Sequence, residues 1–264
     1  MGNKGSIIKG SIAAVFGAAG GIGGAVCAEL YRGGAEVVGL GRHPERIQKE
    51  FHGRAVDLND PASLEAALDA LLERLPDIVV IAAGYDVRKP FLAHDEAEIA
   101  RSVSTNYLSL VAICRRLLPG FTARGSGSIV YVGGFGDGSL AFPFHSVDAS
   151  TRAAAASFLE SLGRESASGL RFLYFGPPAV RTTAEEAYLE QWRKIGVPIV
   201  SPERVARRLT KAIERGERSV AMGLGTRAGI VANALSTRLM DVLFMNAYRD
   251  SFARAFGGGP RGEL

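Results

Sequence analysis

The sequence predicts an α/β protein built on a doubly wound sheet of seven parallel strands, with helices on both faces. Two observations predict this class. Short apolar runs of β type alternate with amphipathic helical runs, and a glycine-rich turn directly follows the first strand. Because parallel strands are joined by crossover segments, the intervening helices are expected to cover the two faces of one sheet.

The alternation extends along nearly the whole chain. The β-type runs are residues 12–16, 36–40, 54–56, 78–82, 128–132, 171–175 and 218–222. The helical runs are one from about residue 21, then residues 44–51, 61–75, 97–118, 147–162 and 202–215. A regular succession of this kind is typical of crossover units in a single parallel sheet.

Length and composition limit the class of protein further. With 264 residues, 47% of them hydrophobic and 22% charged, the chain can bury one sizeable core, so a single domain over residues 1–264 is expected. The formal charge of +4 comes from basic residues scattered among acids, which indicates solvated helix faces and no nucleic-acid partner. The two cysteines, Cys27 and Cys114, lie in apolar helical patterns and need no disulfide. Without a signal peptide or a long uncharged apolar stretch, a cytoplasmic protein is expected, and no pattern indicates a metal site.

Two segments lie outside the alternation. Residues 182–196 carry Tyr188 and Trp192 and are expected to form a helical flap over the carboxyl ends of the strands. Residues 226–258 form a helical C-terminal extension in which four apolar residues share one face: Val231, Leu235, Leu239 and Val242. We interpret the extension as a core-covering or dimer-forming helix, with a helix lying on a membrane surface as the alternative.

The glycine-rich turn predicts a dinucleotide site. It reads Gly17-Ala18-Ala19-Gly20-Gly21-Ile22-Gly23, and its glycines let the backbone approach a pyrophosphate at a helix N-terminus. Here the chain resembles the short-chain dehydrogenase/reductase family, whose fingerprint is T-G-x-x-x-G-I-G on a Rossmann-type fold, with Phe16 at the usual Thr position. The resemblance covers nearly the whole chain and implies cofactor contacts by Gly17, Gly21, Ile22 and Gly23.

The second and third strands carry the residues that select the cofactor. Asp57 and Leu58 match the family's contact with the adenine, although Asp57 could instead cap the helix that starts near residue 61. After the second strand, the chain has Arg42 where NAD-binding folds place an acid. A guanidinium suits a 2′-phosphate, with His43 as a second donor, so NADP(H) is expected; a solvated surface arginine is the other interpretation of Arg42.

The remaining cofactor positions follow from the resemblance. Ala83 and Gly84 stand in the family's N-N-A-G segment beside the adenosine. Pro177, Val180 and Thr182 match its P-G-x-V-x-T segment near the nicotinamide, with Pro178 in place of the glycine.

The family's catalytic positions carry other residues in this sequence. Family members use Ser, Tyr, Lys and Asn, and the register places Gly134 at the Ser, Val147 at the Tyr and Thr151 at the Lys. Asn106 remains, and could either act in catalysis or stabilise a kink in its helix. The chain is therefore interpreted as a divergent member without the usual proton donor.

Other side chains near the same crevice could act in place of the family's catalytic residues. His145 and Tyr85 are candidates for a new acid or base, although a loop histidine is often structural. Asp86, Arg88, Asp137 and Tyr174 lie nearby in the expected fold. The phenylalanines 135, 142 and 144 suggest an apolar pocket, or else ordinary core packing.

Three functions fit these observations. The first is a non-redox enzyme, an isomerase or cyclase, that holds NADP(H) as a structural group and acts on a small apolar molecule. The second is an NADP(H)-dependent oxidoreductase that uses replacement residues, and the third is a non-catalytic, cofactor-dependent partner protein. The resemblance also implies a homodimer or homotetramer.

Overall fold

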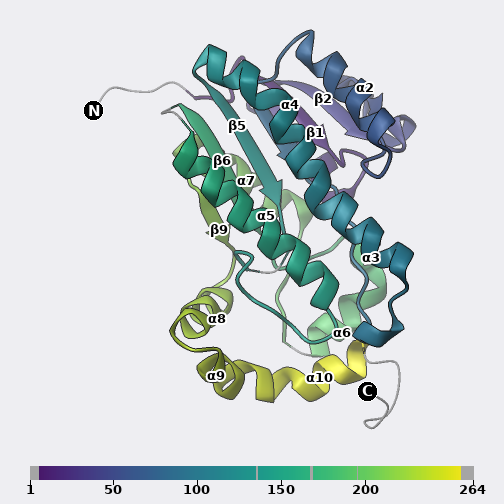
Figure 1. Ribbon diagram of the computed structural model, residues 1–264, viewed down its shortest axis with the longest axis vertical. Coiled ribbons are helices and arrows are strands. Elements are labelled where there is room, and N and C mark those ends of the chain that lie inside the picture. Colours follow the sequence, from purple (N-terminus) through teal and green to yellow (C-terminus); the bar gives the residue numbers. More distant parts are fainter. Residues whose placement is uncertain (1–5, 135, 167–168, 195, 257–264) are drawn as a thin grey trace.

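The computed structural model describes residues 6–134, 136–166, 169–194 and 196–256 (Figure 1). In this part of the chain, seven strands form one parallel sheet in the order β3-β2-β1-β4-β5-β6-β9. The strands are Ile12–Phe16 (β1), Glu36–Gly41 (β2), Arg54–Ala55 (β3), Ile78–Ile81 (β4), Gly127–Val132 (β5), Leu170–Gly176 (β6) and Ser219–Ala221 (β9). The predicted doubly wound sheet is confirmed, and its strand order reverses between β1 and β4, where such folds bind ligands.

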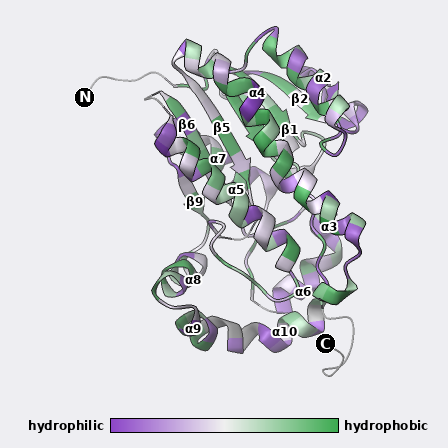
Figure 2. Ribbon diagram, viewed as in Figure 1, coloured by the Kyte–Doolittle hydropathy of each residue, from purple (hydrophilic) through white to green (hydrophobic). Residues whose placement is uncertain are grey.

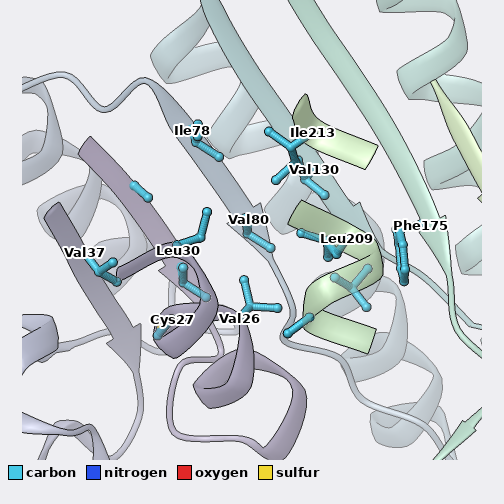
Figure 3. Close-up of a cluster of buried hydrophobic side chains, with 14 of the residues drawn as sticks. Val26, Cys27, Leu30, Val37, Ile78, Val80, Val130, Phe175, Leu209 and Ile213 are labelled. Carbon is cyan, nitrogen blue, oxygen red and sulfur yellow. The ribbon is translucent and has the colours of Figure 1, made fainter. Parts of the chain in front are cut away.

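Helices cover both faces of this sheet. Those between its strands are Gly21–Arg32 (α1), Pro61–Leu72 (α2), Glu96–Val103 (α3), Ser109–Arg124 (α4), Ser146–Glu165 (α5) and Pro202–Arg215 (α7). One buried cluster joins α1 and α7 to the sheet, with Val26, Leu30 and Leu209 among its members (Figure 3). A second cluster joins α2, α4 and α5 to the other face. The two clusters make the strands apolar on both sides, as parallel strands require.

Two helical predictions differ from the structure. Residues 44–51 form two short 3₁₀ turns, Pro44–Arg46 and Lys49–Phe51, because the buried side chain of Ile47 packs against Gly39 and its backbone is extended. The run predicted at residues 97–118 begins at Glu96 and ends at Arg124, and a π-helical segment at Ser104–Leu108 divides it. The hydrophobic pattern predicted neither the full length of this helical run nor its π-helical segment.

The flap and the C-terminal extension lie beyond the carboxyl ends of the strands. After a short strand Ala179–Val180 (β7), the flap comprises a 3₁₀ turn at Thr183–Tyr188 and the helix Leu189–Lys194 (α6), and it returns through Ile199–Val200 (β8). Residue 195 of the predicted flap lies outside the described residues. The extension comprises Leu224–Leu235 (α8), Thr237–Met240 (α9), a π-helical segment Asp241–Met245 and Asn246–Phe256 (α10). Residues 257 and 258 lie outside the described part. Figure 1 shows that α8, α9 and α10 form an arm set apart from the sheet.

Among the described residues, no helix combines the length and apolar character that crossing a bilayer requires.

The core between α7 and the sheet predicts a measurable loss of stability. Leu209 is fully buried, so L209A should lower the free energy of unfolding by about 2–5 kcal/mol through lost burial and a cavity. L224A changes the same residue type at a position that is 85% exposed and should cost less than about 0.5 kcal/mol. Urea unfolding of both variants measures the difference, and equal losses would contradict this account of the core.

Candidate active site and dinucleotide crevice

The turn after β1 can exist only with glycines. Gly17 has a φ of +85°, and a Cβ there would lie 2.6 Å from the backbone nitrogen of Ala83, in the segment after β4. A Cβ on Gly23 would lie 2.1 Å from the carbonyl oxygen of Gly17. The turn therefore brings the start of α1 and the end of β4 into close contact at the reversal of strand order.

The first turn of α1 is suited to an anion. Its N-cap, Gly20, offers no side-chain cap, and no acidic residue stands in the first turn. Thr182 from the flap lies over this end, because a Cβ on Gly21 would be 2.6 Å from Thr182 Cγ2. Free backbone N–H groups together with a hydroxyl-bearing residue fit the pyrophosphate of a dinucleotide.

The predicted cofactor-selecting residues lie along one edge of the crevice. Arg42 is exposed directly after β2 and forms no ion pair with a described residue, whereas His43 Nδ1 lies 3.1 Å from Glu45 Oε1. The carboxylate of Asp57 accepts a hydrogen bond from the backbone nitrogen of Asn59 at 3.0 Å. It does not cap α2, since Asp60 does so.

Asn106 fixes the segment after β4. Its side-chain oxygen accepts from the Tyr85 backbone nitrogen at 2.8 Å, and its side-chain nitrogen donates to the Tyr85 carbonyl at 2.9 Å. Asn106 lies within the π-helical segment, and Tyr131 Oη donates to its carbonyl oxygen at 2.8 Å. These contacts are structural, and the same side-chain nitrogen lies 3.4 Å from Asp148 Oδ1, so a catalytic and a structural role both stay as interpretations of Asn106. Its side-chain nitrogen also lies 3.2 Å from Thr151 Oγ1, which links it to α5.

The centre of the site is occupied by Arg152, which the sequence analysis did not identify. A Cβ on Gly134 would lie 2.7 Å from Arg152 Cδ, and a Cβ on Gly84 would lie 3.3 Å from Arg152 Nη2. The arginine stem therefore fills the space in which a serine at position 134 would project. Its guanidinium reaches the segment after β4.

Arg152 forms a buried ion pair with Asp148, four residues earlier on α5. The two groups are joined by a 2.7 Å hydrogen bond from Arg152 Nε to Asp148 Oδ1, and their side chains are only 12% and 10% exposed. Burial raises the pKa of Asp148 to about 6, although Arg152 opposes this shift. Asp148 can therefore exchange a proton near neutral pH, while Arg152 stays charged.

Gly134, Val147 and Thr151, which the resemblance predicts to occupy the family's catalytic positions, lie around this pair. Gly134 borders the stem of Arg152, and Val147 is buried at the start of α5. Thr151 Oγ1 donates to the Asp148 carbonyl at 2.8 Å. Within this group of positions, Asp148 is the side chain whose protonation can change in the neutral range.

His145 lies in an aromatic cluster with Phe142, Trp192, Phe252 and Phe256. Its Nδ1 is 2.8 Å from the carbonyl oxygen of Pro143, so Nδ1 carries the hydrogen and Nε2 is the free nitrogen. Burial lowers the pKa of His145, which favours the neutral ring. The histidine lines the cavity, and its surroundings pack the flap and α10 together. Phe144 belongs to the same cluster, whereas Phe135 lies outside the described residues.

Tyr85 and Arg88, two further candidates from the segment after β4, have different surroundings in the structure. The ring of Tyr85 packs under the Arg101 guanidinium, 4.5 Å from its carbon, and does not belong to the described cavity lining. Arg88, by contrast, binds Asp86 and the flap residue Glu185, and it stacks on the rings of Tyr188 and Trp192.

Glu185 also accepts a hydrogen bond from Trp192 Nε1 at 2.7 Å. These contacts fasten the flap to the segment after β4. Trp192 was predicted to lie in the flap, whereas the role of Glu185 was not predictable, because nothing in the spacing of residues 88 and 185 reveals their contact.

A cavity of about 660 Å³ connects these groups. Its polar floor includes Asp86, Arg88, Asp148 and Arg152, and Ile22 and Thr182 extend it to the start of α1. Its apolar walls come from the loop after β5, the flap with the segment that follows it, the end of β9 and the arm: Leu140, Phe142, Val197, Met222, Leu224, Met240 and Phe252. Such a site can bind a mainly apolar molecule by one polar group. Among the described residues, no group of side chains is arranged to hold a metal ion.

The parallel sheet, its strand order and the glycine turn define a Rossmann-type protein with a dinucleotide crevice. The sequence profile described as short chain dehydrogenase matches residues 11–193, and the chain belongs to this family. The oxidoreductase UcpA of Escherichia coli is 28% identical over 244 residues, or 88% of this chain and 91% of that protein. The 3-oxoacyl-(acyl-carrier-protein) reductase FabG of Vibrio cholerae is 27% identical over 196 residues, or 70% and 80%.

Solved structures show the same fold. A short-chain dehydrogenase from Streptomyces avermitilis has a TM-score of 0.76 at 24% identity, covering 92% of this chain and 99% of that one. An actinorhodin polyketide ketoreductase, solved with NADPH, has a TM-score of 0.72 at 22% identity, covering 84% and 99%.

The raised pKa of Asp148 predicts a pH-dependent stability. The folded protein holds this proton up to about pH 6, whereas the unfolded chain releases it near the usual 3.8. The unfolded state therefore binds fewer protons in that window, and stability falls as the pH rises through it. The difference in unfolding free energy between wild type and D148N should fall on the order of 3 kcal/mol from about pH 4 to about pH 7.

Urea unfolding at several pH values measures this difference. The matched control is D69N, in which the replaced side chain is 61% exposed; this variant keeps Asp148 and should lose stability with rising pH as the wild type does. A D148N curve parallel to that of the wild type would refute the assignment.

Proposed function

We propose that this protein binds NADP(H) in the crevice and uses Arg152 and Asp148 to move a proton on a small apolar molecule, as an isomerase or cyclase does. The observation that carries the proposal is the position of the Arg152–Asp148 pair, with Arg152 filling the space beside Gly134. The position at which the family keeps its proton-donating tyrosine holds Val147, which has no exchangeable proton.

The cofactor part of the proposal rests on the crevice. The glycine turn, the uncapped start of α1 and Thr182 together suit a pyrophosphate, and Arg42 offers an unpaired guanidinium to a 2′-phosphate. The family relationship and the ketoreductase solved with NADPH agree with this choice. When bound, the nicotinamide would supply a ring capable of hydride chemistry.

The proton-transfer part rests on the two side chains. Arg152 Nε is engaged by Asp148, and its two terminal nitrogens make no hydrogen bond to a described residue. A substrate carbonyl oxygen bound there would gain charge as Asp148 removes a proton from the adjacent carbon, and Arg152 would stabilise that charge. The carboxyl then returns the proton at another carbon, so the substrate is rearranged with no change in oxidation state.

The apolar walls support a substrate with little polarity elsewhere. Apart from the floor, the cavity is bordered mainly by aliphatic and aromatic side chains from several segments, so most of the ligand surface would contact carbon. The Arg88–Glu185 contact holds the flap over this space and excludes water from the ion pair.

An NADP(H)-dependent oxidoreductase is the second candidate. It is favoured by the continuity of the cavity with the start of α1 through Ile22 and Thr182, which would put a substrate beside the nicotinamide. The relatives named an oxidoreductase and a reductase also favour it. In that reaction, Asp148 would deliver the proton and Arg152 would bind the alkoxide.

Replacing Arg42 tests the choice of cofactor. R42A should weaken NADPH binding about 10- to 100-fold, the value of one charge-assisted hydrogen-bond pair, and leave NADH binding nearly unchanged. Titration followed by nucleotide fluorescence measures both constants. R164A removes an exposed arginine at the far end of α5 and should change neither. Equal affinity of the wild type for the two nucleotides would exclude NADP(H) selection, and no binding of either would exclude the cofactor.

Replacing Asp148 tests the chemistry. With NADPH bound, a panel of apolar ketones and enones in D₂O should show enzyme-dependent exchange or isomerisation by NMR without cofactor oxidation. D148N should slow this reaction about 100- to 10,000-fold, and D69N should not affect it. Deuterium arriving on the substrate from labelled cofactor would establish the oxidoreductase instead. Tight cofactor binding with no reaction of either kind would point to the partner protein.

A further inference from the structure

The C-terminal arm, residues 224–256, has two different faces. Its inner face is buried and closes the cavity, with Thr226, Gly229, Met240 and Phe252 among the lining residues. The predicted apolar stripe lies on the opposite side. The interpretation of those residues as a cover for the core is therefore wrong, because small residues such as Gly229 and Ala232 make the inner contacts of α8.

The arm exposes large apolar side chains to solvent, and we call this set the apolar face. Its members and their exposed fractions are Leu224 (85%), Val231 (60%), Leu235 (73%), Leu239 (36%), Val242 (61%) and Leu243 (56%). Figure 2 shows hydrophobic and hydrophilic residues intermixed along α8 and α9, on the part of the molecule farthest from the strands β1 and β2. Large apolar side chains gathered on one solvent-facing surface mark an interaction site.

Arginines are interleaved with the apolar face. Arg227 lies between Leu224 and Val231 at helical spacing, and Arg238 precedes Val242 by four residues. The arm contains four arginines and two aspartates. Arg227, Arg238 and Arg249 are exposed and form no ion pair with a described residue. The surface is therefore both apolar and positively charged.

We propose that the apolar face binds a lipid bilayer that contains anionic lipids. Leucine and valine side chains would enter the boundary between headgroups and acyl chains, and the arginines would lie among anionic headgroups. A second copy of this chain is a poorer occupant, since its arm carries the same excess of arginine over aspartate and therefore offers no complementary charge. The charge pattern thus selects the lipid surface.

The position of the arm links this surface to the cavity. Leu224 both lines the cavity and is the most exposed member of the apolar face, and Met240 lines the cavity from the short helix α9. A bound bilayer would thus lie next to the cavity rim. If the proposed function holds, the substrate is therefore a lipid-soluble molecule that enters the cavity from the bilayer.

Vesicle sedimentation tests the surface without any measurement of activity. The full chain should sediment with vesicles of equal parts phosphatidylcholine and phosphatidylglycerol, more weakly with phosphatidylcholine alone, and less as salt increases. The double variant L235E/V242E should reduce binding at least tenfold, and R238E should reduce it severalfold. Circular dichroism and NADPH titration verify that each variant is folded.

The matched control is L108E, which places the same charge at a leucine of similar exposure outside the arm, at 53%, and should leave binding unchanged. Two results would overturn the proposal. One is no sedimentation with the anionic vesicles, and the other is a wild-type dimer, by light scattering, that L235E/V242E dissociates. If the wild-type protein binds the vesicles but catalyses no Asp148-dependent reaction, only the proposed chemistry is refuted. If it catalyses that reaction but does not bind the vesicles, only the bilayer contact is refuted.

Discussion

The buried ion pair between Arg152 and Asp148 determines what else can occupy the carboxyl ends of β4 and β5. Removing two charges from water costs several kcal/mol each, and the pair is tolerable only because the charges meet with good hydrogen-bond geometry. The stem of Arg152 needs the space that a side chain at position 134 would take. Glycine at 134 and arginine at 152 are therefore one structural arrangement, and a serine at 134 would force the arginine to move.

The Arg152–Asp148 pair lies within a framework of hydrogen bonds from neighbouring segments. Asn106 binds both backbone groups of Tyr85, so it sets the position of the segment that the guanidinium approaches. Its side-chain nitrogen also donates to Asp148 Oδ1 at 3.4 Å, so Asn106 links that segment to the ion pair. The π-helical segment that contains it leaves a carbonyl for Tyr131 Oη, and the loss of either contact would leave a buried polar group unpaired. The framework thus depends on buried hydrogen bonds that are needed for folding whichever reaction the site performs.

The sequence was sufficient for the sheet, because the central strands β1, β4 and β5 contain continuous apolar runs, and each predicted strand matches the structure within one residue at either end. The glycine turn was also predictable, since its φ and its close contacts allow no other residue. Arg152 was not found, because an arginine four residues after an aspartate usually indicates an exposed helical pair. Asp148 and Arg152 are buried because α5 packs against Gly134. The contact between Arg88 and Glu185 joins residues 97 positions apart, which local patterns cannot reveal.

The arm shows a second thing that hydrophobic periodicity cannot predict, namely what an apolar helix face contacts. A stripe at helical spacing identifies residues that share a face, and it does so correctly for Val231 and Leu235, but it carries no information about which surface that face meets. In α8 the small residues Gly229 and Ala232 pack inward, where Gly229 faces the side chains of Met240 and Leu140 at the edge of the cavity. The larger side chains are consequently directed outward. An amphipathic helix at the mouth of an apolar cavity therefore needs a second apolar environment, and its arginines indicate that this environment is anionic.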